Sequence, residues 1–162
     1  KNGFLINLID FGLSEDRKHL YFGKKISGSK GYIAPEVSLS WLEKRYSFKT
    51  FSQAVQSDVF SLGMTFWRIL KGREENILYQ KILLINKAAW AKGEDLATVD
   101  ELKEISLTYE KEYHIAVEAS EKLSSNSGSI KNQNDLEFLI LQMLSPDVSK
   151  RPSLKLALKI LK

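Results

Sequence analysis

The sequence contains no cysteine, which excludes disulfide cross-links and thiolate metal sites. Its two histidines, His19 and His114, lie far apart, and neither has a partner at metal-ligand spacing. No apolar run approaches the roughly 20 residues that a membrane-spanning helix requires, so we expect no membrane segment in this stretch. These absences leave a chain that has to fold around an apolar core, and they fit a reducing compartment.

The sequence also lacks a block of charge of one sign. Its 24 Lys and Arg residues and 20 acidic residues give a formal net charge of +4, and the two signs are interspersed. We interpret this mild imbalance as an ordinary solvated surface, and we predict no nucleic-acid partner. Hydrophobic residues make up 43% of the 162 positions, which is enough for the core of one domain or of a large piece of one.

The spacing of the apolar residues predicts one short strand followed by a helical body. Phe4–Ile9 is typical of a buried strand. Two capping-box patterns, Thr98 with Glu101 and Asn134 with Glu137, precede apolar residues at helical spacing. Ser153 is placed to cap a last helix in the same way. Helices are expected over 35–42, 57–70, 76–92, 98–117, 134–144 and 153–161.

The helix expected over 57–70 carries apolar residues on nearly every side, a pattern typical of a helix buried among others. Ser57 is a suitable N-cap, and Asp58 would lie favourably near the positive end of the helix dipole. Lys71 and Gly72 supply a cation and a stop at the other end. We therefore predict that this helix is the most buried element of the fold.

Four short motifs follow one another along the chain. "IDFGLS" at 9–14 ends the expected strand, and "GSKGYIAPE" at 28–36 follows a long loop. "SDVFSLG" at 57–63 opens the apolar helix, and "MLSPDVSKRPS" at 143–153 closes the pattern. Alone, Asp-Phe-Gly is compatible with a simple turn. Together and in this order, the four motifs resemble the C-terminal lobe of eukaryotic protein kinases of the serine/threonine type.

The resemblance covers nearly the whole chain. It implies a mainly α fold, the helical C-lobe of the α+β protein kinase fold, with a short β piece at the N-terminus. Residues 1–162 are then a partial kinase domain whose activation segment spans 10–36. The first residue is a lysine, and the stretch 76–130 is longer than the family pattern. We therefore expect a fragment that begins just before Asp-Phe-Gly and holds an insertion within 76–130.

The resemblance assigns the nucleotide chemistry to the Asp-Phe-Gly motif. A carboxylate at the end of a rigid strand can hold a magnesium ion at a fixed place, and by resemblance Asp10 binds the Mg²⁺ that accompanies ATP. Phe11 would pack into the core and set the direction of Asp10, and Gly12 would let the backbone turn sharply. ATP, Mg²⁺ and a protein substrate are the partners that follow from this assignment.

Four further residues have roles by the same resemblance. Ser29 would contact the catalytic loop, which favours serine/threonine specificity, and Asp58 would support the backbone of that loop. Glu36 and Arg151 would form a buried ion pair that ties the end of the activation segment to the helical body. Taken one at a time, these residues are compatible with an ordinary loop, a helix end and the solvated surface.

Several kinase parts are absent from the 162 residues, namely the His-Arg-Asp catalytic loop, the glycine-rich loop and the ATP-anchoring lysine. We expect the missing N-lobe to be required in cis and the fragment alone to be inactive. The leading hypothesis is a cytoplasmic serine/threonine protein kinase that transfers the ATP γ-phosphate to a protein hydroxyl. The alternatives are a pseudokinase scaffold without catalysis and a helical protein-interaction module with accidental motifs.

Overall fold

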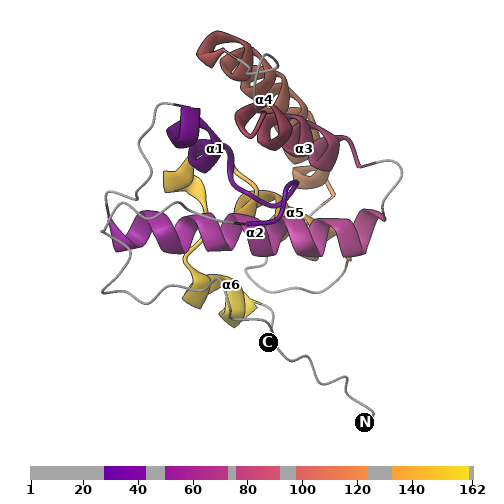
Figure 1. Ribbon diagram of the computed structural model, residues 1–162. Coiled ribbons are helices and arrows are strands. Elements are labelled where there is room, and N and C mark those ends of the chain that lie inside the picture. The colour runs from indigo at the N-terminus through magenta and orange to yellow at the C-terminus, as the bar shows by residue number, and fades with distance from the viewer. Residues whose placement is uncertain (1–27, 43–49, 73–75, 92–97, 124–132, 161–162) are drawn as a thin grey trace.

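The computed structural model describes residues 28–42, 50–72, 76–91, 98–123 and 133–160. Within these ranges every regular element is a helix, so the expected mainly helical fold is confirmed (Figure 1). The strand expected over 4–9 lies outside the described residues. The elements are α1 (Pro35–Leu42), α2 (Phe51–Lys71), α3 (Ile77–Ala89), α4 (Val99–Glu121), α5 (Gln133–Met143), the short 3-10 helix η2 (Val148–Lys150) and α6 (Leu154–Ile160).

Helix α2 runs across the middle of the molecule, with α1, α3 and α4 on one side and α6 on the other (Figure 1). It packs against α5, α6 and η2, while α3 packs against both α1 and α4. Phe60 and Met64 are completely buried, and Trp67 is nearly so. The prediction that neighbouring helices cover these three side chains is confirmed, because the apolar face of α2 has partners along its length.

The start of α2 differs from the prediction. The helix begins at Phe51 and not at residue 57, and its N-cap is Thr50, whose hydroxyl accepts a hydrogen bond from the Gln53 amide. Ser57 and Asp58 therefore lie inside the helix, and the prediction that Ser57 caps it was wrong. Residues 51–56 mix polar and apolar side chains and give a weak sequence signal, because the first turn of α2 is largely exposed to solvent.

The other end of α2 also departs from the expectation of burial on every side. Ile69 is 76% exposed, so solvent reaches one face of the last turns. The helix ends as predicted at Lys71 and Gly72, and the Gly72 amide donates a hydrogen bond to the Arg68 carbonyl. Gly72 has a φ of 74°, which is the left-handed region that favours glycine at a helix end.

Two of the predicted helix caps are confirmed. At the start of α4 the Thr98 hydroxyl accepts from the Glu101 amide, and the Glu101 carboxylate accepts from the Thr98 amide. Hydrogen bonds from the backbone and side chain of Thr98 hold the pKa of Glu101 below its usual range. At α6 the Ser153 hydroxyl accepts from the Leu156 amide. Both patterns could be found in the sequence because their partners are three residues apart.

The second capping-box prediction was wrong. Helix α5 begins at Gln133, so Asn134 lies inside it, where its side chain donates a 3.4 Å hydrogen bond to the Leu123 carbonyl. Glu137 does not reach back to a helix end and instead pairs with Lys71 of α2 at 2.6 Å. Tertiary contacts with α2 and with the turn that follows α4 thus replace the local pairing that the spacing suggested.

Helix α4 is long but amphipathic. Leu102 and Tyr109 are completely buried on its inner face, and the Tyr109 hydroxyl donates to the Leu144 carbonyl at the end of α5. Its outer face carries many charged side chains, with Leu107 and Ile115 exposed among them. Within the described ranges, none of the helices is both long enough and apolar enough to cross a bilayer.

Candidate functional site

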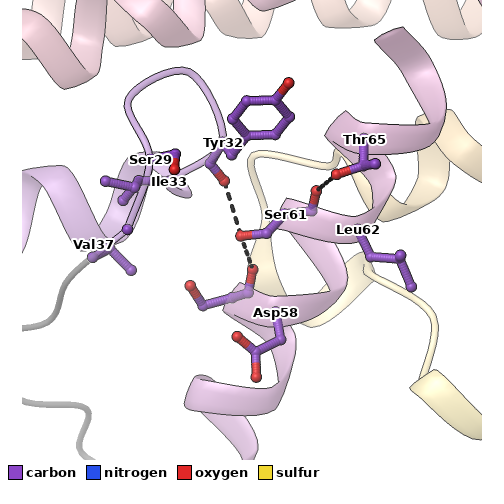
Figure 2. A pocket seen from close by; sticks show the side chains of 10 residues that line it. Ser29, Tyr32, Ile33, Val37, Asp58, Ser61, Leu62 and Thr65 are labelled. Carbon is purple, nitrogen blue, oxygen red and sulfur yellow. Dashed lines mark hydrogen bonds between the residues drawn. The ribbon is translucent and has the colours of Figure 1, made fainter. Parts of the chain in front are cut away.

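A pocket of about 550 Å³ separates the loop before α1 from helix α2 (Figure 2). Both residues that the sequence linked to a catalytic loop, Ser29 and Asp58, line it. The structure therefore brings together two side chains that come from separate segments of the chain. One wall consists of Gly28, Ser29, Tyr32, Ile33 and Val37, and the other of Ser57, Asp58, Ser61, Leu62 and Thr65.

Ser61 joins the two walls of this pocket. Its hydroxyl lies 2.9 Å from the Tyr32 carbonyl oxygen and 3.1 Å from that of Ser57, so it can donate to either one (Figure 2). The Thr65 hydroxyl donates in turn to the Ser61 carbonyl at 3.0 Å. The loop is thus tied to α2 by a hydrogen bond between residues that line the pocket.

Asp58 lies beside this link, and its carboxylate points away from Tyr32 in Figure 2. The side chain has an exposed side, yet enough protein surrounds it that desolvation raises the pKa of the carboxyl. It makes no hydrogen bond or ion pair with any of the residues that the structure describes. A partly desolvated carboxylate of this kind is available to accept hydrogen bonds from a segment that docks in the pocket.

Ser29 occupies the opposite wall. Its carbonyl accepts a hydrogen bond from the Tyr32 amide at 3.1 Å, which closes a turn before α1. Its side chain is exposed at the rim of the pocket. Ser29 and Asp58 therefore lie on opposite walls of the same pocket.

The loop is held from behind by Asn86, a residue that sequence reasoning missed. Asn86 is completely buried in α3, and its Oδ1 atom accepts from the Gly31 amide at 2.7 Å. Its Nδ2 atom donates to the Ile33 carbonyl at 3.1 Å and to the Ser38 hydroxyl at 2.8 Å. The signal that could have revealed it is an amide directly beside the apolar face of a predicted helix, where burial requires hydrogen-bond partners.

A second missed feature is a cluster of Tyr32, Arg68 and Tyr79. The Arg68 guanidinium donates to the Tyr32 hydroxyl at 2.5 Å and lies 4.1 Å from the centroid of the Tyr79 ring. The two tyrosine rings meet edge to face with centroids 6.0 Å apart. This cluster fixes the side chain of Tyr32 at the end of the pocket and connects α2 to α3.

Glu36 and Arg151 form the ion pair that the sequence predicted. The guanidinium donates to the two carboxylate oxygens at 2.7 and 2.8 Å, and its side chain is completely buried. It also donates to the carbonyls of Ser145 and Gln56 and lies 4.8 Å from the centroid of the Phe60 ring. Its hydrogen bonds therefore connect α1, α2 and the segment that follows α5.

The structure does not test the predictions about nucleotide binding. Asp10, Phe11 and Gly12 lie outside the described residues, so their roles stay predictions. In the described part of the chain, no three His, Cys, Asp or Glu side chains are grouped so that they could hold a metal ion. His114 is exposed on α4 and contacts the edge of the Tyr113 ring, which agrees with the expectation of an ordinary surface residue.

Residues 1–161 match the family model of the protein kinase domain, and the chain therefore belongs to the protein kinase family. Family membership and the Glu36–Arg151 pair together exclude the hypothesis of an interaction module with accidental motifs, which required these two residues to lie apart.

Curated relatives come from Arabidopsis thaliana. The chain is 36% identical over 81 residues to G-type lectin S-receptor-like serine/threonine-protein kinase SD1-13, and the matched stretch covers 47% of this chain and 9% of the relative. It is 30% identical over 103 residues to cysteine-rich receptor-like protein kinase 44, and this match covers 57% of this chain and 24% of the relative. The matches thus span less than a quarter of these relatives. No solved structure matches the chain significantly.

Proposed function

We propose that this protein is a serine/threonine protein kinase that transfers the γ-phosphate of ATP to a hydroxyl of a protein substrate. The observation that carries the proposal is that a member of the kinase family places Ser29 and Asp58 on facing walls of one pocket. One of its relatives is named a serine/threonine-protein kinase, which supports the same specificity.

In this proposal the pocket receives the catalytic loop of the full-length protein. Ser29 offers a hydroxyl from the rim, and Asp58 offers a carboxylate that has no partner among the described residues. Backbone amides of a docked loop would donate to that carboxylate and replace the water that it loses on burial. Both residues position the loop and do not themselves touch the reacting atoms.

The nucleotide end of the mechanism rests on the Asp-Phe-Gly motif. Asp10 would hold Mg²⁺, and Phe11 would set the direction of Asp10. Gly12 would allow the sharp backbone turn that follows these two residues. Magnesium, when bound, neutralises the charge that develops on the transferred phosphoryl group. Residues 1–162 contain no His-Arg-Asp motif, so the catalytic base, and with it turnover, would require the N-lobe and catalytic loop in cis.

The test is phosphate transfer by the full-length protein to serine, threonine and tyrosine peptides. Asp10→Asn removes an anionic metal ligand at constant size and should abolish transfer, whereas Asp16→Asn, a matched acid outside the motif, should leave transfer intact. We expect serine and threonine peptides to be phosphorylated and tyrosine peptides to be spared.

Two outcomes would contradict the proposal. Undiminished turnover by Asp10→Asn would show that Asp10 is not the metal ligand. A full-length protein that binds partners but neither binds ATP nor transfers phosphate would be a pseudokinase scaffold, the alternative that the missing catalytic motif leaves open.

A further inference from the structure

The turn that carries Ser29 is held by hydrogen bonds from two helices. Inside the turn the Tyr32 amide donates to the Ser29 carbonyl at 3.1 Å. From the side of α2, the Ser61 hydroxyl lies 2.9 Å from the Tyr32 carbonyl oxygen, a link that Figure 2 shows. From the side of α3, Asn86 accepts from the Gly31 amide at 2.7 Å. Neighbouring backbone groups of the turn are therefore fixed to different helices.

The side chain of Asn86 spans the turn as a neighbouring strand would. Its Oδ1 atom accepts from the Gly31 amide, and its Nδ2 atom donates to the carbonyl of Ile33, two residues further on. The second Nδ2 hydrogen goes to the Ser38 hydroxyl at 2.8 Å. Asn86 is completely buried, so water cannot replace these partners. An aspartate would lack both donors, and a leucine would lack all three bonds.

Helix α3 contacts the turn at a second point. Tyr79 lies seven positions before Asn86, which places both side chains on the same face of α3. Its ring is so close to Gly31 that a Cβ atom there would lie 2.5 Å from it, and it meets the Tyr32 ring edge to face. The place of the turn relative to α3 is thus set both by packing and by hydrogen bonds.

The turn needs this support because little else holds it. Gly28, Ser29 and Lys30 are exposed, so solvent covers its outer side. Gly31 has a φ of 91°, and glycine has access to many other backbone conformations. Hydrogen bonds from α2 and α3 therefore select the one conformation in which Ser29 lies at the pocket rim.

We propose that Asn86, together with Ser61, is a positioning residue that fixes the Ser29 turn so that the catalytic loop docks in one arrangement. The inference rests on the proposed function, in which the pocket receives that loop. Neither side chain would touch ATP or the reacting atoms. Their effect reaches the reaction through the place of Ser29, and a displacement of about 1 Å in such an arrangement can lower a rate about a hundredfold.

The experiment combines hydrogen exchange and kinetics of the full-length protein. In Asn86→Ala, we expect faster exchange both in the turn over residues 29–33 and in the catalytic loop. The kcat of phosphate transfer should fall about tenfold, because the catalytic loop is less well placed. The KM for ATP should change little, since Asn86 makes no contact with the Asp-Phe-Gly motif in this proposal.

A milder variant tests the same turn from the other helix. Ser61→Ala removes the bond to the Tyr32 carbonyl, and we expect it to fold because alanine is the most favourable residue inside a helix. It should change exchange and kcat in the same direction as Asn86→Ala but by less. It therefore decides the outcome if Asn86→Ala does not fold.

Two controls separate positioning from loss of stability. Ser38→Ala removes the third hydrogen bond of Asn86 and leaves both bonds to the turn in place. Leu139→Ala destabilises the protein at a buried site in a different core cluster from that of Ile33. With all assays run well below the melting temperatures, both controls should leave kcat and exchange in the turn unchanged.

Unchanged exchange in the turn of Asn86→Ala, or faster exchange there with full kcat, would overturn the proposal. So would an equal loss of kcat in Leu139→Ala, because the effect would then be one of stability alone. Hydrogen exchange does not require turnover. Faster exchange of the catalytic loop in a protein that transfers no phosphate would therefore uphold the positioning role and refute the phosphotransfer function.

Discussion

Arg151 donates two hydrogen bonds, of 2.7 and 2.8 Å, to the carboxylate of Glu36, a residue 115 positions earlier in the chain. The arginine side chain is completely buried, whereas that of Glu36 is 30% exposed. The pair is therefore asymmetric, since removal of the glutamate leaves a buried cation and removal of the arginine leaves an anion that water can still reach. This asymmetry gives the first prediction.

Glu36→Gln should lower the free energy of unfolding by about 3 kcal/mol or more, because it leaves the buried Arg151 charge without its anion. Chemical denaturation of the 162-residue chain measures this loss of stability. The matched control is Glu137→Gln, which breaks the more exposed pair with Lys71 and should cost less than about 1 kcal/mol. Equal costs for the two variants would show that Arg151 is not dependent on Glu36.

Gly31→Ala should destabilise the loop beside the pocket. Gly31 has a φ of 91°, and a Cβ atom there would lie 2.5 Å from the Tyr79 ring. Gly72 also has a positive φ, of 74°, but a Cβ atom there would meet nothing within 4 Å. Gly72→Ala should therefore show only the backbone cost of about 1–2 kcal/mol, and Gly31→Ala should exceed it.

Thermal and chemical denaturation of both glycine variants would check this difference. Gly31→Ala combined with Tyr79→Ala provides the control, because it removes the clash and leaves the backbone strain. The double variant should lose less free energy of unfolding than the sum of the losses of the two single variants. Independent, additive effects would contradict a direct contact between residue 31 and the tyrosine ring.

Asn86→Ala should cost about 2–4 kcal/mol, since it leaves the Gly31 amide, the Ile33 carbonyl and the Ser38 hydroxyl without their buried partner. Hydrogen exchange at the Gly31 amide should become faster. Asn134→Ala is a matched control, because Asn134 makes one exposed hydrogen bond of 3.4 Å. It should change stability by less than about 0.5 kcal/mol.

Asp58→Asn should stabilise the described domain while it impairs the full-length kinase. Desolvation raises the pKa of Asp58, so the folded chain binds the proton more tightly than the unfolded chain. Stability is therefore lost as pH rises from the ordinary aspartate pKa, about 3.9, through the raised folded value. At neutral pH the charge is unfavourable, and its removal should add less than about 1 kcal/mol because solvent screens the exposed side.

The melting temperatures of Asp58→Asn and the unmodified chain, compared as a function of pH, would test this sign. The difference should be present at pH 7 and should vanish below about pH 3.9, where both side chains are neutral. In the full-length protein the same variant should reduce kcat, because it weakens the support that we propose for the catalytic loop. A variant that is less stable at pH 7 would contradict the assignment.

Local sequence patterns predicted the features whose partners are near in the chain. The Thr98–Glu101 box and the Ser153 cap were found because each is satisfied within one helical turn. The burial of Phe60 and Met64 followed from a helix with apolar residues at every turn. The Glu36–Arg151 pair was predicted through resemblance to a family, because nothing in either residue's neighbourhood indicates the other.

The tertiary structure decided the features whose partners are distant. The place of Asn134 inside α5 went against a local capping pattern, since the energy of packing exceeds that of one cap. Helix α2 begins at Phe51 because Thr50, and not Ser57, provides its N-cap. Asn86 binds an amide 55 positions away, and Arg68 meets a hydroxyl 36 positions away. A sequence shows that such side chains are polar. Only the fold determines which buried donors and acceptors they meet, because the energy of a hydrogen bond or charge depends on its partner and on the exclusion of water.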